Sequence, residues 1–354
     1  MLDFPDSPLG VKKIAGTYYI FADSGWVPSS GHSGIQGMIS PDMNSLSTNY
    51  TIYTPTGNLS LGGTNDFDRD YVGGGATIYD AVNNNIIILY HGEYHWVQGQ
   101  PHFTGGLGLA VSHDLGMTWT KMGVVLLPNY NWSTCTGTND PAGLDIGDGD
   151  LNMRPDGFTY FYYNEKAGSC MSTTVFNGVA RANTAALLAA AVAGGQPSGT
   201  LFQKYSGGSF STPGVLNTSN QALGGGTSDN ISPSLFMYDP VVRYDSYINK
   251  YIMTYIVPWT GLSIAFSTDG MTWTNPTPIL TGGTTPSGNN AFVYGTPVNT
   301  DGGDPDVLGS SFWVYYEDPY GDWSQTNLAR VLVTITSAGA AKPTAPTILK
   351  AVAH

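Results

Sequence analysis

Short runs of β-branched and aromatic residues recur along the chain, and each run has the length of a β-strand. Three of the runs contain tyrosine and end in a glutamate: Ile86–Glu93, Thr159–Glu165 and Ser311–Glu317. Two more runs, Gly16–Asp23 and Lys250–Val257, match this pattern without the glutamate. A turn and an earlier strand precede each run, so the sequence contains five similar units.

Five units of successive antiparallel strands, without alternating helices, predict an all-β chain that folds as a five-bladed β-propeller. The units lie roughly 60 to 90 residues apart, more than a minimal four-stranded blade needs, so long loops are expected. A two-sheet sandwich is the structural alternative. The equivalent second strands of the five blades are expected to contain Tyr18, Leu89, Phe161, Ile252 and Val314.

One short helix is expected outside the blades. Asn183–Val192 is rich in alanine and leucine, and we place it at the periphery, after the third unit. The propeller is assigned to residues 1–336, and residues 337–354 to a loosely attached C-terminal tail. The glycine runs Gly73–Gly75 and Gly224–Gly226 are expected where backbones turn or approach closely.

Acidic residues hold fixed places in the repeat. Glu93, Glu165 and Glu317 are the only glutamates among 26 acidic residues, and all three end a second strand. In a propeller the inner strand of each blade starts at the ligand-binding face, and the second strand returns to that face. Acids at these two places should therefore ring one pocket. They are Asp6, Asp70, Asp148, Asp150, Asp239, Asp304 and Asp306 before inner strands, and Asp23, Glu93, Glu165, Glu317 and Asp318 after second strands.

Composition narrows the class of partner. The formal net charge is −13, which argues against nucleic acid and against an anionic membrane surface, because both need clustered cations. Charged residues are 11% of the chain, against about a quarter in typical proteins, while aromatic residues reach 12%. No phosphate-binding loop, nucleophile elbow or zinc-protease motif occurs in the sequence. This composition is typical of a secreted, strand-rich protein that handles sugars.

The two cysteines support an oxidising compartment. Cys135 and Cys170 lie in polar segments rich in Gly, Ser and Thr, so we expect one disulfide, with two free thiols as the alternative. Five Asn-x-Ser/Thr sequons occur, about as many as chance gives for this composition, so they do not decide the compartment. No signal-peptide pattern opens the sequence, and we expect a secreted protein whose signal is absent from this chain.

The residues from Asp6 to Phe21 form an Asp-Ser-Pro opening, a short strand, a Gly turn and a Tyr-Tyr-Ile-Phe strand. This segment resembles the opening of the five-bladed propeller glycosidases of glycoside hydrolase families 43, 32 and 62. The turns Ser112–Trp119 and Ser267–Trp273 read Ser-x-Asp-(x)-Gly-Met-Thr-Trp, a pattern that recurs in the same group and in sialidases. The resemblance implies a propeller that hydrolyses glycosidic bonds.

The resemblance assigns one catalytic role directly. Asp6 corresponds to the general base of the family, although Ser7 separates it from Pro8. Asp239 stands where family 43 has a glutamate as general acid, so that role is not carried over.

Glycoside hydrolysis needs one carboxyl that donates a proton and one carboxylate that acts as base or nucleophile. Asp6 is assigned the second role. Glu165 is the expected acid, because the nearby charges of Asp148 and Asp150 should raise its pKa. Asp150 would tune the pair, and Asp239 would orient the substrate or replace the acid.

The sequence His91-Gly-Glu93-Tyr-His95 places three polar side chains on one side of an extended strand. We expect them to contact sugar hydroxyls; a metal site and simple hydrogen bonding at a strand end are the alternatives. No metal is assigned to the catalytic site and no cofactor is required, although Gly147–Asp150 and Gly303–Asp306 could bind a structural calcium. The expected substrate-binding residues are His91, Glu93, His95, Asp70, Trp96, Asp306 and Glu317.

Two functional hypotheses follow. The first is a secreted, monomeric glycosidase, arabinofuranosidase-like, that acts on a furanose-containing or other neutral glycan. The second is a non-catalytic carbohydrate-binding propeller that uses the same pocket. Activity against a panel of glycans separates the two.

Overall fold

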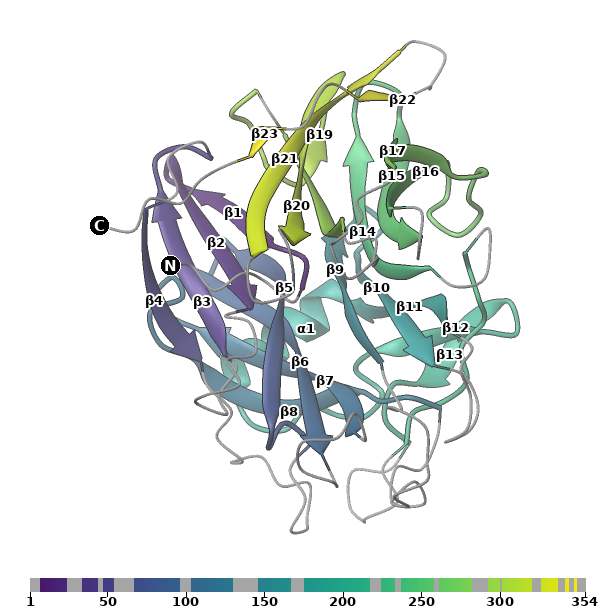
Figure 1. Ribbon diagram of the computed structural model, residues 1–354. Coiled ribbons are helices and arrows are strands. Elements are labelled where there is room, and N and C mark those ends of the chain that lie inside the picture. Colours follow the sequence, from purple (N-terminus) through teal and green to yellow (C-terminus); the bar gives the residue numbers. More distant parts are fainter. Residues whose placement is uncertain are drawn as a thin grey trace.

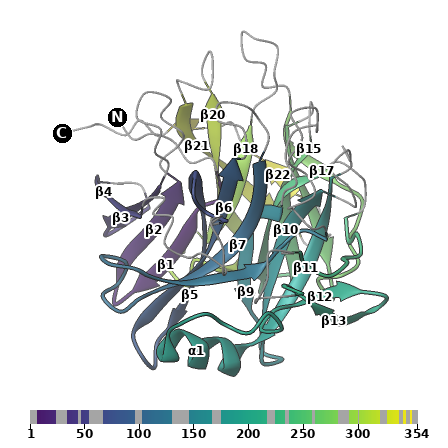
Figure 2. The ribbon, with the colours of Figure 1, turned by 90° about the horizontal axis from the view of Figure 1, so that it is seen from below.

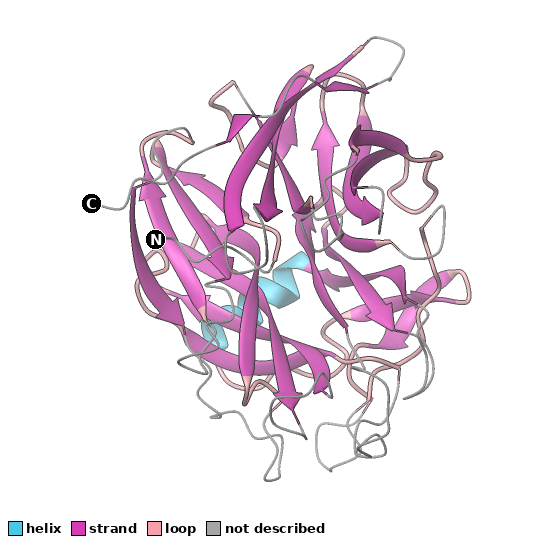
Figure 3. Cartoon of the chain, viewed as in Figure 1, coloured by secondary structure: helices cyan, strands magenta, loops and turns pink. Residues whose placement is uncertain are grey.

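The computed structural model consists of five sheets arranged around a common axis (Figure 1), and their strands pair antiparallel except for β19, which pairs in parallel with β14. Nearly all regular structure is strand, with a single helix in the described residues (Figure 3). The prediction of a five-bladed β-propeller is confirmed. The structure describes residues 7–23, 34–43, 47–53, 67–95, 103–129, 146–166, 175–216, 224–232, 237–257, 261–281, 292–299, 301–319, 326–336, 341–343 and 347–348.

The first two blades contain four strands each, in sequence order. Blade 1 consists of β1 (Gly10–Ile14), β2 (Thr17–Asp23), β3 (Ile35–Ser40) and β4 (Ser47–Tyr53). Blade 2 consists of β5 (Tyr71–Asp80), β6 (Asn85–His95), β7 (Phe103–Ser112) and β8 (Thr120–Leu126).

The other three blades contain five strands each. Blade 3 consists of β9 (Ile146–Met153), β10 (Phe158–Lys166), β11 (Val175–Asn183), β12 (Gln203–Ser206) and β13 (Ser209–Pro213). Blade 4 consists of β14 (Tyr238–Asp245), β15 (Lys250–Val257), β16 (Gly261–Ser267), β17 (Thr277–Leu280) and β19 (Val307–Leu308). Blade 5 consists of β18 (Val293–Asn299), β20 (Ser311–Pro319), β21 (Thr326–Ile335), β22 (Ala341–Pro343) and β23 (Thr347–Ile348).

The repeat found in the sequence corresponds to the second strand of each blade. These strands are β2, β6, β10, β15 and β20, and each pairs with an inner strand and a third strand. We call the end where inner strands begin and second strands finish the ligand end. The five predicted positions all lie in second strands: Tyr18, Leu89, Phe161, Ile252 and Val314.

Two details differ from the sequence-based expectation. Asp304 and Asp306 were expected before the inner strand of the fifth blade, but that strand is β18, and both acids follow it in the hairpin toward β20. They therefore lie at the end of the axis opposite the ligand end. Within the predicted C-terminal tail, β22 and β23 pair with β21, so these residues belong to blade 5.

The helix α1 (Thr184–Ala193) follows β11 directly, and the side chain of Asn183 caps it by accepting a hydrogen bond from Ala186 N at 3.0 Å. Leu187 and Ala191 are buried in the core shared by blades 2 and 3. Because β11 runs away from the ligand end, the helix covers the opposite end of these blades, at the bottom of the view in Figure 2. No helix in the described part of the chain has the length and hydrophobicity to cross a membrane.

Blades pack through five hydrophobic cores, one between each pair of neighbours. The strand β6 shows how one sequence serves two cores, since alternate residues point to opposite faces of a sheet. Ile86, Ile88 and Tyr90 face blade 1, while Ile87 and Leu89 face blade 3. A sheet that is buried on both faces explains why these strands read as continuous apolar runs.

The ring closes between blades 1 and 5 without a strand shared between them. Among the described strands, those of blade 1 come from the N-terminal part of the chain and those of blade 5 from the C-terminal part. Side chains join the two blades instead. Leu9 and Val11 pack with Val298 and Tyr315 in one core. The Tyr315 hydroxyl donates a hydrogen bond to the Met43 carbonyl at 3.2 Å.

We expect Tyr315→Phe to lower the free energy of unfolding by about 1–3 kcal/mol, because the buried Met43 carbonyl loses its donor. Tyr247→Phe is the matched control, since Tyr247 is 50% exposed in a turn, and it should change stability by less than about 0.5 kcal/mol. Urea unfolding curves of the three proteins measure this difference. Equal stability of the two variants would show that the hydroxyl does not help to close the ring.

Candidate active site

The inner strands carry a repeated β-bulge near the ligand end. In β5, β14 and β18, two residues of the inner strand face a single tyrosine of the second strand. The first residue of each pair has a positive φ. The pairs are Gly74-Gly75 opposite Tyr90, Asp239-Pro240 opposite Tyr255, and Tyr294-Gly295 opposite Tyr316.

Asp239 is the acid that occupies such a bulge in blade 4. Its φ of 54° lies in the left-handed region, which a residue other than glycine adopts at a cost of order 1–3 kcal/mol. The residue is 5% exposed. Strained bulges of this kind gather next to active sites, where they aim a side chain that a regular strand would direct elsewhere. Asp239 is therefore the strongest catalytic candidate among the described residues.

Blade 3 has an irregularity at the same height. The register of β9 against β10 shifts between Gly147 and Gly149, so Asp148 is the extra residue of the strand. The repeat thus places one acid on the inner-strand bulge of blade 3 and another on that of blade 4. The side chain of Asp148 lies outside the described residues.

A chain of polar side chains links blades 1 and 2 at the ligand end. The Tyr71 hydroxyl donates a hydrogen bond to the buried Asp23 carboxylate. The Tyr71 ring meets the His91 ring edge-on at 5.8 Å, and His91 Nε2 lies 4.0 Å from Glu93 Oε1. A Cβ on Gly73 would lie 2.5 Å from the Tyr71 hydroxyl and 2.8 Å from Asp23 Oδ2, so a larger residue there would displace this contact. Glu93 keeps 13% of its side chain exposed, which leaves it able to meet a ligand.

Backbone contact between these blades explains the glycine run. A Cβ on Gly75 would lie 2.4 Å from the Pro8 carbonyl oxygen and 2.6 Å from Gly10 N. The expected close approach of backbones at Gly73–Gly75 is therefore confirmed. This contact holds the start of β1, and with it the residues that follow Asp6, against β5.

A cavity of about 10 Å³ lies between blades 2 and 3, lined by Gly74, His91, Gly149 and Phe161 among others. That volume holds about one water molecule. A sugar ring does not fit, so this cavity is not the place for a glycan.

Two further predicted binding residues lie at the ligand end. Asp70 directly precedes β5 and forms a forked ion pair with Arg69, with Oδ2 2.8 Å from Nη2. Glu317 is 4% exposed and faces Val293 across the β18–β20 pair. The neighbouring carboxyl of Asp318 has its pKa raised by burial.

Glu165 ends β10 at the ligand end, as predicted, but its surroundings do not suit a general acid. It has no exposed surface. Both carboxylate oxygens lie 3.1 Å from Lys204 Nζ, and they also accept hydrogen bonds from Ser228 Oγ and Asn129 N, each at 2.7 Å. Burial lowers the pKa of Lys204 and the Glu165 charge raises it, so the pair depends on both partners. A general acid must touch the substrate, whereas Glu165 joins β10, β12 and two loop segments.

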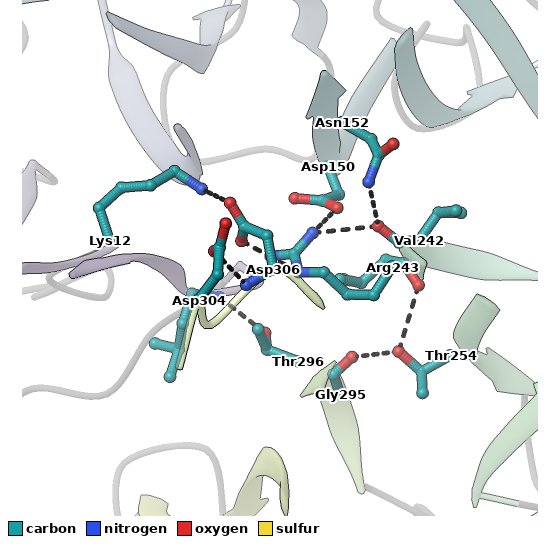
Figure 4. Close-up of polar contacts among 12 residues, drawn as sticks. Lys12, Asp150, Asn152, Val242, Arg243, Thr254, Gly295, Thr296, Asp304 and Asp306 are labelled. Atoms are coloured by element: carbon teal, nitrogen blue, oxygen red, sulfur yellow. Dashed lines mark hydrogen bonds and ion pairs between the residues drawn. The ribbon is translucent and has the colours of Figure 1, made fainter. Parts of the chain in front are cut away.

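Asp150 and Asp306 lie along the axis, where they contact two cations of the chain (Figure 4). Asp150 accepts a hydrogen bond from Arg243 Nη1, and Asp306 pairs with Lys12. The expectation that Asp306 contacts substrate at the ligand end does not fit this position. Each of the two segments that could bind calcium contributes one acid to this cluster, Asp150 and Asp306, and the described residues contain no group of three or more metal-binding side chains.

Asp6, Trp96, Cys135 and Cys170 lie outside the described residues, as does the side chain of His95. The general base, the disulfide and these sugar contacts stay predictions.

Three contacts were not predicted: Tyr71 with Asp23, Lys204 with Glu165, and Arg243 with the acids on the axis. The glycine run beside Tyr71 is the one sequence signal that points to the first of them. The other two join residues far apart in the chain, at separations of 39 and 93 positions.

Comparison with known proteins supports the fold. Neither family models nor curated proteins match the sequence. Among solved structures, an endo-1,4-β-xylanase from Bacteroides thetaiotaomicron is similar at 13% identity and TM-score 0.57, with 99% of this chain and 96% of that chain covered. An α-L-arabinanase from Cellvibrio cellulosa, complexed with arabinohexaose, is similar at 11% identity and TM-score 0.55, with 97% and 95% covered.

A xylan β-1,4-xylosidase from Bacillus halodurans is similar at 14% identity and TM-score 0.52. The match covers 96% of this chain and 55% of that one, so this chain spans about half the length of the xylosidase. At such identities the likeness shows a shared fold, and it confirms at that level the resemblance to propeller glycosidases.

We expect Glu165→Gln to lower the free energy of unfolding by about 3–5 kcal/mol, because it leaves the buried Lys204 charge without its partner. Lys204→Met should cost a similar amount. The double variant should lose less than the sum of the two, as denaturant unfolding can show. Strictly additive losses would mean that the two groups do not stabilise each other.

Asp318 provides a test with a defined pH dependence. Its folded pKa lies above the unfolded value of 3.8, so the ionised carboxylate opposes folding once the pH exceeds the folded pKa. Below 3.8 the group is protonated in both states and this cost vanishes. Asp318→Asn should therefore raise the thermal midpoint at pH 7, and the gain should shrink as the pH falls toward 4.

Asp301→Asn is the control for that experiment, because Asp301 is an exposed turn residue at the far end of the axis. It should give no gain at pH 7. A lower midpoint for Asp318→Asn than for the wild type at pH 7 would contradict the burial argument.

Proposed function

We propose that this chain is a glycoside hydrolase that cleaves a neutral, furanose-containing or similar glycan at the ligand end of the propeller. The observation that carries the proposal is Asp239, a strained acid on the inner-strand bulge of blade 4, in a repeat that gives Asp148 the matching place in blade 3. The fold shared with xylan- and arabinan-directed enzymes supports it as an analogy.

The catalytic roles follow from placement. Asp239 donates a proton to the glycosidic oxygen as the bond from that oxygen to the anomeric carbon breaks. Asp6 activates the attacking water or attacks the anomeric carbon itself, a role that rests on the resemblance of the opening segment. Asp239 takes the place of the expected acid Glu165, because the buried Glu165 carboxylate is paired with Lys204.

The charge of the site argues for a neutral substrate. Asp23, Glu93, Asp239 and Glu317 bring carboxylates to the ligand end, and the nearby cation Arg69 is paired with Asp70. A glycan rich in uronic acids would be repelled by these groups and by the net charge of −13. Hydroxyl-rich neutral sugars can instead hydrogen-bond to carboxylates and to His91.

Secretion and the Cys135–Cys170 disulfide belong to the same proposal. A low share of charged residues, many aromatic side chains and a glycan substrate all suit an extracellular enzyme. The alternative function is a carbohydrate-binding propeller without catalysis. The replacement of the family glutamate by Asp239 favours it, because aspartate is shorter by one methylene.

We expect Asp239→Asn to lower the turnover of the best neutral substrate by about 10²–10⁴-fold with folding intact. Asp301→Asn is the matched control and should keep full activity. Release of reducing ends from arabinan, fructan, galactan and aryl furanosides, with polygalacturonate as the anionic comparison, measures this.

Binding of a neutral glycan without any release of reducing ends would favour the non-catalytic alternative. Full activity of Asp239→Asn would remove Asp239 from the catalytic pair. Preference for polygalacturonate would overturn the argument from charge.

A further inference from the structure

Four of the five blades send a charged side chain to the axis, below the ligand end (Figure 4). Lys12 comes from β1, Asp150 from β9, Arg243 from β14, and Asp306 from the hairpin after β18. Arg243 is 1% exposed, and the side chains of Lys12 and Asp150 are 8% and 4% exposed. Charges removed from water to this extent need close partners.

The guanidinium of Arg243 reaches two carboxylates on different blades. Nη1 donates to Asp150, and Nε lies 3.2 Å from Asp306 Oδ1. The Lys12 ammonium binds the other oxygen of Asp306. A planar guanidinium can serve two carboxylates at once, which a single ammonium group does less well.

We propose that Arg243 is a positioning residue that, with Lys12, acts as a built-in cation between Asp150 and Asp306 and so holds the acid-bearing strands β9 and β14 together. The positioning role rests on the function proposed above. It also gives a different partner to acids of Gly147–Asp150 and Gly303–Asp306, the segments that could bind calcium: Asp150 and Asp306 contact protein cations.

The count of charges supports this role. Two cations contact the carboxylates of Asp150 and Asp306, and burial lowers the pKa of both Lys12 and Arg243, whereas Asp306 and Asp304 raise it. The two cations also repel each other, and they are held by the carboxylates and by the Val242 carbonyl, which accepts a hydrogen bond from Arg243 Nη1 at 3.1 Å. Without Arg243, Lys12 alone would face Asp150 and Asp306, and the excess negative charge would favour a cation that takes oxygen ligands, such as calcium.

The geometry ties this cluster to the proposed catalytic acids. Asp150 is two residues from Asp148 on β9, and Arg243 is four residues from Asp239 on β14. A second contact supports the same pairing, because Asn152 Nδ2 donates to the Val242 carbonyl at 3.4 Å. Thus the inner strands of blades 3 and 4 are tied together just below their bulges.

A similar tie continues to blade 5. Thr254 is fully buried on β15, and its hydroxyl lies 2.6 Å from the Gly295 carbonyl oxygen, to which it donates a hydrogen bond. Gly295 is the second residue of the bulge that begins at Tyr294. Side-chain contacts of Arg243, Asn152 and Thr254 thus align the inner strands β9, β14 and β18. Loss of the Arg243 contacts should therefore shift the proposed catalytic acids on β9 and β14.

The test compares the full-length wild type, Arg243→Met, and Arg243→Met combined with Asp150→Asn. Thermal midpoints are measured in EDTA and in millimolar calcium chloride. Arg181→Met is the matched control, because Arg181 stacks on Phe158 and Phe210, away from the axis.

We expect Arg243→Met to melt at a lower temperature than the wild type and to gain more from calcium than the wild type does. The double variant should melt higher than Arg243→Met in EDTA and lose the added calcium response. Arg181→Met should respond to calcium as the wild type does. If calcium raised the thermal midpoint of Arg243→Met and of the wild type equally, the proposal that Arg243 acts as a built-in cation would be wrong.

Activity gives an independent readout. Arg243→Met should lower kcat by about 10²-fold with little change in KM, because catalytic groups displaced by about 1 Å lose rate in this range. Calcium should restore part of kcat. Unchanged kcat in the folded variant would overturn the positioning role. If the wild type hydrolyses no glycan, the proposed function fails, while the calcium response still tests the built-in cation.

Arg243→Lys covers the case in which Arg243→Met does not fold. It keeps one charge but reaches one carboxylate at a time, so we expect an intermediate midpoint and a small gain from calcium. If Arg243→Lys had the thermal midpoint and kcat of the wild type, any cation would suffice, and the simultaneous contact of the guanidinium with Asp150 and Asp306 would play no role.

Discussion

The relative placement of four of the five blades at the axis rests on the buried contacts of Arg243. A buried ion pair does not add much net stability, because removing the charges from water costs about as much as their attraction returns. Its value lies in geometry, since a buried charge allows few alternative arrangements. Through Asp150, Asp306 and Lys12, the guanidinium fixes four blades relative to one another. The hydrophobic cores between blades are less directional and could tolerate small shifts.

The same repeat position leads to different chemistry in different blades. Glu93, Glu165 and Glu317 all finish a second strand, yet Glu165 is matched with Lys204 and hidden, while Glu93 lies beside His91 and keeps some exposure. On the inner strands, the bulge carries glycine in blade 2, aspartate in blade 4 and tyrosine in blade 5. The fold thus supplies equivalent places, and the partners of each side chain decide whether it can act on a ligand.

Much of the fold was predictable because it depends on local patterns. Strand-length apolar runs, the repeated tyrosines and the turn signals at Ser112–Trp119 are properties of short segments, and they located all five second strands. The inner strand of blade 5 was misplaced because the Gly303–Asp306 segment looks like the start of a blade, whereas it is a hairpin turn. Such a choice depends on pairing between strands, which sequence spacing alone does not specify.

The candidate site was less predictable for a related reason. That acids would gather at one end followed from the repeat, but whether Glu165 is free or paired depended on Lys204, from a strand outside the repeat pattern. The strain at Asp239 depended on a register shift between β14 and β15, which no residue type announces.

The most direct test of the account is a crystal structure of Asp239→Asn with a neutral oligosaccharide that the wild type cleaves. The account predicts an intact glycan across the ligand end of the axis, with a glycosidic oxygen within hydrogen-bonding distance of the residue 239 side chain. A glycan bound on the outer strands, or at the end that carries Asp306, would contradict it.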